Sequence, residues 1–220
     1  MGIVMGYISL LGFLLLAAKF IARKTKSERI NCFFGKLHKP VSCIFLLTCV
    51  IHLFLVLPVF KTRNLSVIVF GIIGLVIAIL LILLCHTIKD KQKKMFWHRT
   101  LTLVLLITAI IHITVSVIDF VQYKNNISDI EITDVDITAI ADGKYIGDYD
   151  AGYIYAKVQV TVKEGELTDI KILEHGNERG KKAESIVNHI MDEQRLDVDA
   201  ITGATNSSLV IQKACENALK

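Results

Sequence analysis

The sequence predicts a chain of two fold classes: an N-terminal all-α bundle of four transmembrane helices, followed by a small C-terminal α+β domain. Three observations support this prediction. The chain of 220 residues is 53% hydrophobic with a mean hydropathy of +0.52, and the apolar excess is confined to its first half. The two halves carry opposite net charges. In the second half, segments that alternate between apolar and polar residues replace the long apolar stretches.

Four apolar stretches of the N-terminal half are near the roughly 20 residues that a helix needs to cross a bilayer. They run over residues 3–18, 41–60, 65–88 and 101–120. The first stretch has no small-residue cleavage site and its charges follow it, so we interpret it as a membrane anchor and not as a removed signal peptide. We therefore expect residues 1–120 to form a multi-pass domain in contact with membrane lipid.

The distribution of charge predicts the orientation of these spans. Residues 1–120 contain 14 Lys and Arg against 3 Asp and Glu, whereas residues 121–220 contain 11 against 18. Most of the N-terminal basic residues lie in two segments, 22–39 and 89–99. Because basic loops stay on the cytoplasmic side of a membrane, both segments are expected to be cytoplasmic. The N-terminus and the whole C-terminal domain are then extracytoplasmic, in a protein of the cell membrane.

Histidines recur at matched positions on the second and fourth expected spans. His38 and His52 are 14 positions apart, as are His98 and His112, and both pairs are related by an offset of 60. Fourteen residues make about 3.9 helical turns, so the members of each pair face one way, about 21 Å apart. HKPVSCIFLLTCVIH and HRTLTLVLLITAIIH also match at other positions, which indicates a repeated helix.

Because the second and fourth spans run in the same direction, His38 is expected level with His98, and His52 level with His112. Two imidazoles that face each other at one depth can be the axial ligands of a six-coordinate haem, so the repeat predicts two stacked haems. The pattern resembles the two-haem, four-histidine cores of transmembrane b-type cytochromes, including ferric reductases and NADPH oxidases. The competing interpretation is that each histidine is an interfacial or helix-bridging hydrogen-bonding residue. His86 lacks a matching partner and is interpreted as an interfacial residue or a substitute ligand.

The composition changes after residue 120. Residues 121–141 are expected to form a polar tether, and residues 142–220 the α+β domain. Alternation around a Gly turn predicts a hairpin with one buried face, and apolar residues at helical spacing predict two amphipathic helices. The hairpin strands are expected at 153–162 and 167–173, and the helices at 181–192 and 208–219.

The stretch DAITGATNSS, residues 199–208, lies where a loop enters the last predicted helix. Its segment from Thr202 to Ser207 fits the pattern Ser/Thr-Gly-Ala-Thr-x-Ser/Thr. With DGKYIGDYDAGY and VKEGELTDIKILEH, it resembles the FMN-binding domains of the sodium-pumping quinone reductase, its Rnf-type relatives and many extracytoplasmic electron-transfer proteins. In the stretch from His175 to Gly180, the chain departs from the Glu-Thr-Pro-Gly run that many relatives have beside the flavin.

The resemblance implies that a separate flavin transferase joins FMN, through its phosphate, to the last hydroxyl of the motif, Ser207. Thr205 and Ser208 remain alternative acceptors. A helix N-terminus tolerates the phosphodiester anion, and a side-chain hydroxyl is the nucleophile that the attachment needs. The competing interpretation is an ordinary helix cap. The cofactor-binding residues expected from the motif are Asp199, Thr202, Gly203, Ala204, Thr205 and Ser207.

Together these observations predict a membrane flavocytochrome that moves electrons through two haems to FMN and on to an extracytoplasmic acceptor, an oxidoreductase or electron-transfer component. The chain has no Gly-x-Gly-x-x-Gly fingerprint, so its donor is expected to be a quinol or a cytoplasmic protein. No nucleic acid is expected among its partners. Two alternatives stay open: a redox-sensing membrane protein, and a haem-free, flavin-bearing subunit of a larger complex.

Overall fold

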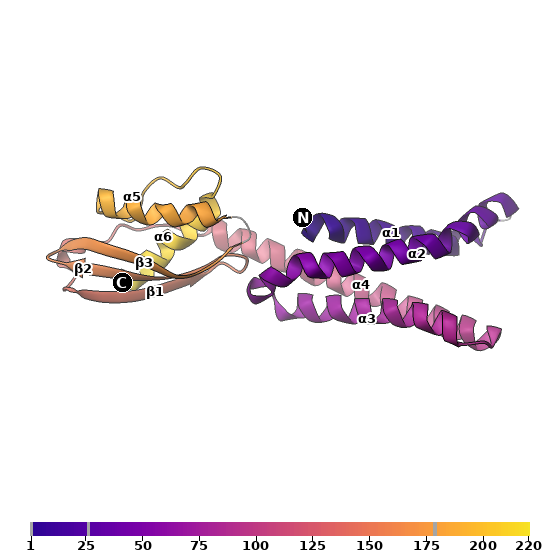
Figure 1. Ribbon diagram of the computed structural model, residues 1–220. Coiled ribbons are helices and arrows are strands. Elements are labelled where there is room, and N and C mark those ends of the chain that lie inside the picture. Colours follow the sequence, from indigo (N-terminus) through magenta and orange to yellow (C-terminus); the bar gives the residue numbers. More distant parts are fainter. Residues whose placement is uncertain (1, 26, 178–179) are drawn as a thin grey trace. The chain divides into compact units, whose positions relative to one another are not determined.

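The computed structural model describes residues 2–25, 27–177 and 180–220, which fall into two compact units. The helical unit comprises Met1–Phe60 and Ser66–Thr114, and the C-terminal unit comprises Lys61–Leu65 and Val115–Lys220. All regular elements described in the first unit are helices, and the second unit combines a three-stranded sheet with helices (Figure 1). The predicted fold class is confirmed for both halves.

Among the described residues, four helices are long and apolar enough to cross a membrane, as many as the apolar stretches of the sequence, and they are compatible with membrane embedding. They are α1 (Gly2–Ala22), α2 (Glu28–Val56), α3 (Leu65–Thr87) and α4 (Lys91–Ser128), with a short 3₁₀ helix, η1 (Leu57–Thr62), after α2. Helices α1, α2 and α4 include polar residues outside their apolar stretches, whereas α3 nearly coincides with its stretch and α2 ends four residues before the end of its own.

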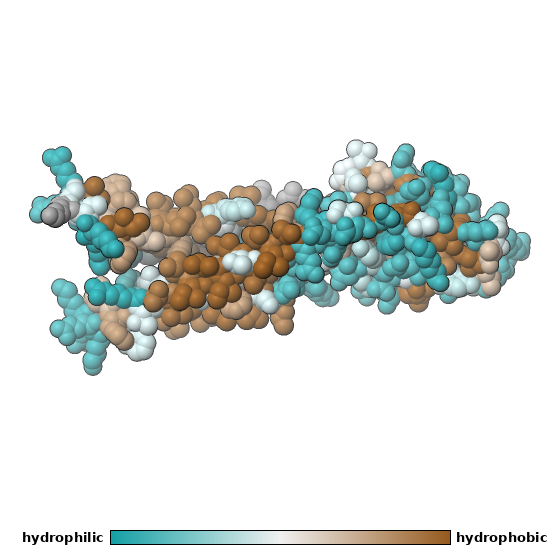
Figure 2. All heavy atoms as spheres, turned by 180° about the vertical axis from the view of Figure 1, so that it is seen from behind, coloured by the Kyte–Doolittle hydropathy of each residue, from teal (hydrophilic) through white to brown (hydrophobic). Residues whose placement is uncertain are grey.

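The helical unit buries few side chains within itself. Phe13, Ile77, Ala78 and Leu105 form its small core, with one residue from α1, two from α3 and one from α4. Most of its large apolar side chains are exposed, and in Figure 2 they cover the visible surface of the helices. Hydrophilic residues gather at the end of this unit where both helix hairpins turn. This distribution fits helices that face lipid along their length.

The sheet of the C-terminal unit is antiparallel in the order β1 (Gly143–Asp150), β2 (Tyr155–Lys163), β3 (Glu166–Gly176). The predicted hairpin is confirmed as β2 and β3. Its turn residues, Glu164 and Gly165, have φ of 54° and 78°, the left-handed values that a tight two-residue hairpin turn requires. Strand β1 was not predicted, because two glycines interrupt its short alternation.

Helices cover one face of this sheet (Figure 1). They are α5 (Ile186–Glu193), which follows the 3₁₀ helix η3 (Gly180–Ser185), and α6 (Thr205–Leu219). The residues of β2 that face them, including Val158 and Val160, are fully buried. Helix α6 approaches β1 so closely that a Cβ on Gly147 would overlap the helix backbone and lie 2.7 Å from the Cα of Ala218. A glycine is therefore required at this crossing.

Residues 121–141, for which the sequence predicts a polar tether, are largely part of the C-terminal fold. Helix α4 continues to Ser128, and Tyr123 and Ile127 are buried in the core of the C-terminal unit. Further along, a carboxylate oxygen of Asp134 accepts hydrogen bonds from the amides of Leu196 and Asp197, both at 2.9 Å. Apolar residues within this polar sequence pack against the sheet domain, so tertiary contacts order the segment.

Candidate functional site

The motif at residues 199–208 forms a tight turn that leads into helix α6. The amide of Ala204 donates to the carbonyl of Ile201 at 2.9 Å, and Gly203 at the third position of the turn has a φ of 78°. Only glycine adopts this conformation readily, which explains the Gly of the motif. Asp199 and Thr202 are exposed beside the turn, whereas Ala204 is buried.

The three candidate hydroxyls at the start of α6 have different surroundings. Thr205, the first helical residue, is exposed. Ser207 is 2% exposed. Ser208 is fully buried, and its Oγ accepts a hydrogen bond from the Ile201 amide and donates one to the Ala204 carbonyl, both at 3.1 Å. Ser208 therefore holds the turn closed, and its hydroxyl is already engaged.

Gly180, the first residue of η3, covers the Ser207 side chain. A Cβ on Gly180 would overlap the Ser207 hydroxyl and lie 2.7 Å from its Cβ. Only a residue without a side chain can pack at this position. The sequence places these two residues far apart, so neither periodicity nor motif spacing predicts their contact.

A buried histidine lies at the end of β3, just before this segment. The His175 side chain is 2% exposed. Its Nδ1 lies 3.1 Å from Oε1 of Glu184, a carboxylate oxygen that accepts a hydrogen bond from Nδ1. Asn177 lies 3.2 Å from the same nitrogen and donates to the His175 carbonyl at 3.4 Å. The Nε2 of His175 is buried and has no hydrogen-bond partner among the described residues. Glu178 and Arg179, in the stretch singled out from the sequence, lie outside the described residues.

An aromatic cluster lies beside the start of α6. The side-chain amide of Asn206, the residue before Ser207, donates to the Tyr123 hydroxyl at 2.8 Å. Tyr123 stacks on Tyr153, with ring centroids 4.7 Å apart and an interplanar angle of 11°, and the Arg63 guanidinium lies 3.3 Å from the Tyr153 centroid. Sequence reasoning missed this cluster, since its members come from three distant segments.

The N-terminus of α6 is suited to a negative charge. Its first turn contains no acidic residue. Within the part of the chain that the structure describes, no group accepts a hydrogen bond from the backbone amides of Thr205, Asn206 or Ser207. Free amides at a helix N-terminus, together with the helix dipole, favour an anion such as a phosphate.

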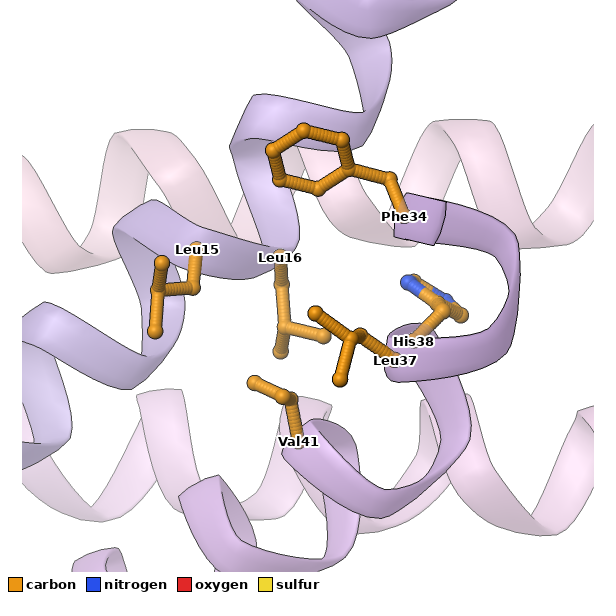
Figure 3. A pocket seen from close by; sticks show the side chains of 6 residues that line it. All are labelled: Leu15, Leu16, Phe34, Leu37, His38 and Val41. Carbon is orange, nitrogen blue, oxygen red and sulfur yellow. The ribbon is translucent and has the colours of Figure 1, made fainter. Parts of the chain in front are cut away.

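His38 and His98, which we call the inner pair, lie close together. The rings of His38 and His98 have centroids 5.9 Å apart at an angle of 81°. His98 Nδ1 lies 3.6 Å from Sγ of Cys85, whereas His38 Nδ1 is buried with no partner among the described residues. His38 also borders a cavity of about 30 Å³ between α1 and α2, shown in Figure 3. The cavity is lined by Leu15, Leu16, Phe34, Leu37, His38 and Val41.

His52 and His112, which we call the outer pair, each bond to the backbone of a neighbouring helix. His52 Nδ1 lies 2.9 Å from the carbonyl oxygen of Gly2, and His112 Nδ1 lies 3.1 Å from that of Val67. His86 is exposed, and its Nδ1 bonds to the Ile82 carbonyl of its own helix, as an interfacial residue does. Within the described ranges, no group of three or more His, Cys, Asp and Glu could hold a metal ion, so any such site depends on histidine pairs.

Comparison with known families supports the resemblance of the C-terminal half. Residues 152–220 match the sequence model of a family described as the FMN-binding domain. The match covers β2 onward, including the turn at residues 199–208, and begins after β1. No curated protein and no solved structure matches the chain.

Proposed function

We propose that the chain is a membrane electron-transfer protein that carries FMN covalently on Ser207 and passes electrons to an acceptor outside the cytoplasm. The observation that carries this proposal is the hydroxyl of Ser207 at the N-terminus of α6, inside the region that matches FMN-binding domains. The same chain has four helices that could cross a membrane. FMN attached at this point supplies a centre that exchanges one or two electrons.

Three features of the C-terminal unit fit FMN. The unbonded amides of the first turn of α6 would receive the phosphate that joins flavin and protein. The buried Nε2 of His175 lacks a partner among the described residues, and such an atom costs free energy unless a ligand or water satisfies it. Tyr123, bonded to Asn206, belongs to an aromatic cluster of the kind that a flat ring system stacks against.

Ser207 is the preferred acceptor among the three hydroxyls. The Ser208 hydroxyl is used within the turn, so flavin on Ser208 would break two hydrogen bonds. Thr205 is exposed and easier to reach, but it occupies the fourth position of the motif, whereas the acceptor is expected at the last position. Because Ser207 is 2% exposed and Gly180 covers it, attachment there requires Gly180 to move away from α6.

The histidine pairs fit a second proposal, that two b-type haems carry electrons across the helical unit. Imidazole nitrogens bind metal ions at about 2 Å, so two rings on one ion have centroids roughly 6 Å apart. The His38 and His98 rings, at 5.9 Å, match this separation. His52 and His112 would hold the second haem. Bound haem supplies a one-electron carrier whose iron has no open position for substrate.

The orientation follows from the basic segments at 22–39 and 89–99, which would be cytoplasmic. Electrons would then enter from a quinol or a cytoplasmic donor, pass the His38/His98 level before the His52/His112 level, and leave from the extracytoplasmic flavin. A flavin transferase is the partner required for maturation.

One observation favours a second candidate, a haem-free flavin-bearing subunit of a larger complex. The cavity beside His38, lined by α1 and α2, has room for one or two water molecules and not for a porphyrin. A third candidate, a redox sensor, uses the same flavin without net turnover. An absorption spectrum of the reduced protein separates the first two, since only the flavocytochrome has b-type haem bands. Haem-dependent turnover separates the sensor from an electron carrier.

The attachment point is tested by expressing the full chain together with a flavin transferase and recording flavin fluorescence after denaturing electrophoresis. Ser207→Ala should remove the fluorescent band. Thr205→Ala, the matched control two residues earlier in the chain, should keep it. Ser208→Ala should also keep it, although the loss of two hydrogen bonds will lower stability by about 1–2 kcal/mol. A band that persists in Ser207→Ala and disappears in Thr205→Ala would move the flavin to the exposed hydroxyl.

A further inference from the structure

Two glycines face the outer histidines at equivalent places in the two helix hairpins. A Cβ on Gly6 of α1 would lie 3.2 Å from Cε1 and 3.4 Å from Nδ1 of His52. A Cβ on Gly71 of α3 would lie 3.1 Å and 3.4 Å from the same atoms of His112. The two Cε1 distances are shorter than an ordinary van der Waals contact, so an alanine would require each ring to shift by a few tenths of an ångström. Each imidazole therefore packs on the bare backbone of the helix before its own.

The same two helices also fix the tautomer of these histidines. A carbonyl oxygen only accepts hydrogen bonds, so the contacts of Gly2 with His52 and of Val67 with His112 require a proton on each Nδ1. In a neutral imidazole, Nε2 then carries the lone pair that binds a metal. The arrangement matches the way that metal-binding histidines are oriented by a backbone carbonyl on the opposite nitrogen.

The glycine and the carbonyl belong to one device. Gly6 lies four residues after Gly2, and Gly71 lies four residues after Val67. In an α-helix, the amide of each glycine therefore bonds to the carbonyl that also meets the imidazole. A glycine at this position leaves the carbonyl one turn earlier open to a second donor, and the imidazole is that donor. The contacts that α1 makes with His52 are therefore equivalent to those that α3 makes with His112, although the two glycines are 65 positions apart and not 60.

The inner histidines lack this device. His38 Nδ1 is buried without a hydrogen-bond partner among the described residues, and the neighbour of His98 Nδ1 is a thiol at 3.6 Å. A thiol is a weak donor and a weak acceptor, so it selects no tautomer strongly. The two levels of the bundle thus differ in how well their imidazoles are oriented before any ligand arrives.

We propose that Gly6 and Gly71 are positioning residues that, with the carbonyls of Gly2 and Val67, hold His52 and His112 as Nε2 ligands, so that the outer pair binds haem more tightly than the inner pair. This inference rests on the haem part of the proposed function. Its reason is that the outer site spends no free energy on ring orientation or tautomer exchange, whereas the inner site must do so. The carbonyl bonds also raise the basicity of the ligands.

The experiment compares Gly6→Ala and Gly71→Ala with Gly12→Ala and Gly74→Ala in the full chain. The controls lie on the same helices, but their new Cβ atoms would make ordinary contacts, 3.5 Å from Phe45 and 3.8 Å from Thr108. Each protein is freed of haem and titrated with it, and the outer site is identified as the low-spin electron paramagnetic resonance signal that is absent from His52→Ala.

The wild type should fill this outer signal with the first equivalent of haem. Gly6→Ala and Gly71→Ala should weaken outer binding about 10-fold or more, the usual effect of losing an orienting partner, and should leave the inner signal in place. Equal effects of all four substitutions, or first filling of the inner site in the wild type, would overturn the proposal.

A second measurement keeps the inference separate from the haem proposal. Nitrogen-15 NMR of histidine-labelled, haem-free protein reports which ring nitrogen carries the proton. His52 and His112 should be protonated at Nδ1, and this preference should weaken in Gly6→Ala and Gly71→Ala. A wild type that binds no haem but shows this pattern would refute the haem assignment and leave the positioning device intact. A mixture of tautomers in the wild type would refute the device itself.

Discussion

The two units of the chain place their apolar side chains in opposite ways. Within the described part of the helical unit, Phe13, Ile77, Ala78 and Leu105 form a small buried core, while large apolar residues along all four helices are exposed. The C-terminal unit encloses its apolar residues, and Val158, Val160 and Ile186 are fully buried. The C-terminal domain is therefore stabilised from within, whereas the exposed apolar surface of the helices is compatible with surrounding lipid.

The largest effect expected in this comparison is from Gly147→Val. Its side chain would overlap the backbone of α6, which cannot move aside as a flexible side chain could, so the C-terminal domain should lose at least about 3 kcal/mol and fail to fold. Limited proteolysis of the full chain in membranes measures this, and the four spans should stay protected. Gly143→Ala, on the same strand and 3.4 Å from the Tyr145 ring, is the control and should remain resistant. Degradation of the spans together with the domain would show that the units are not independently stabilised.

A smaller effect is expected when one apolar side chain is truncated in each unit. Ile190→Ala removes a fully buried side chain from the C-terminal core and should cost about 2–5 kcal/mol. Leu14→Ala removes a side chain of α1 that is 55% exposed, and in lipid this should change stability by less than about 1 kcal/mol. Thermal unfolding of the purified chain in lipid nanodiscs measures both. Similar costs for the two variants would contradict the difference between the units.

The smallest effect concerns a charged group that only the C-terminal core contains. Glu216 is fully buried, and burial by itself raises the pKa of its carboxyl, but hydrogen bonds from Lys220, Lys213 and the Thr133 amide outweigh burial and lower the pKa below its usual 4.5. Because the folded pKa is depressed, this stabilisation is complete at neutral pH and is lost as the pH falls below about 4.5.

Glu216→Gln should therefore destabilise the domain at pH 7 by about 1–3 kcal/mol and reduce its sensitivity to acid. Unfolding midpoints of the wild type and the variant between pH 3 and 7 give the test. A wild type and a variant that lose stability in parallel on acidification would assign the acid sensitivity to other carboxyl groups.

Much of this architecture could be predicted from the sequence, because composition and periodicity act locally. The four spans follow from uninterrupted apolar runs, and the β2–β3 hairpin follows from alternation around Gly165. The continuation of α4 to Ser128 could not be predicted, because Tyr123 and Ile127 are buried by partners that come later in the chain. Strand β1 was missed for the same reason, since Gly147 matters only where α6 crosses it.

The candidate site divides along the same line. The turn at Gly203 and the order of hydroxyls after it are written in a short motif, whereas the contact of Gly180 with Ser207 joins distant segments. The His175 and Glu184 pair gives no periodic signal. The repeat of α2 and α4 gives no signal for the outer histidine device, because Gly6 and Gly71 are 65 positions apart whereas the repeated histidines are 60 apart. The carbonyl bonds themselves are backbone contacts and could only be found in the structure.

The burial of Ser207 beneath Gly180 has a consequence for the life of the protein after synthesis. A hydroxyl that is 2% exposed in the folded domain is offered to a modifying enzyme only while α6 and η3 are apart. Under the proposed function, flavin attachment to Ser207 would compete with folding, and the yield of loaded protein would depend on which of the two is faster. Molecules that fold first must wait for a local opening, whose frequency is set by the stability of this one contact region and not by that of the whole domain.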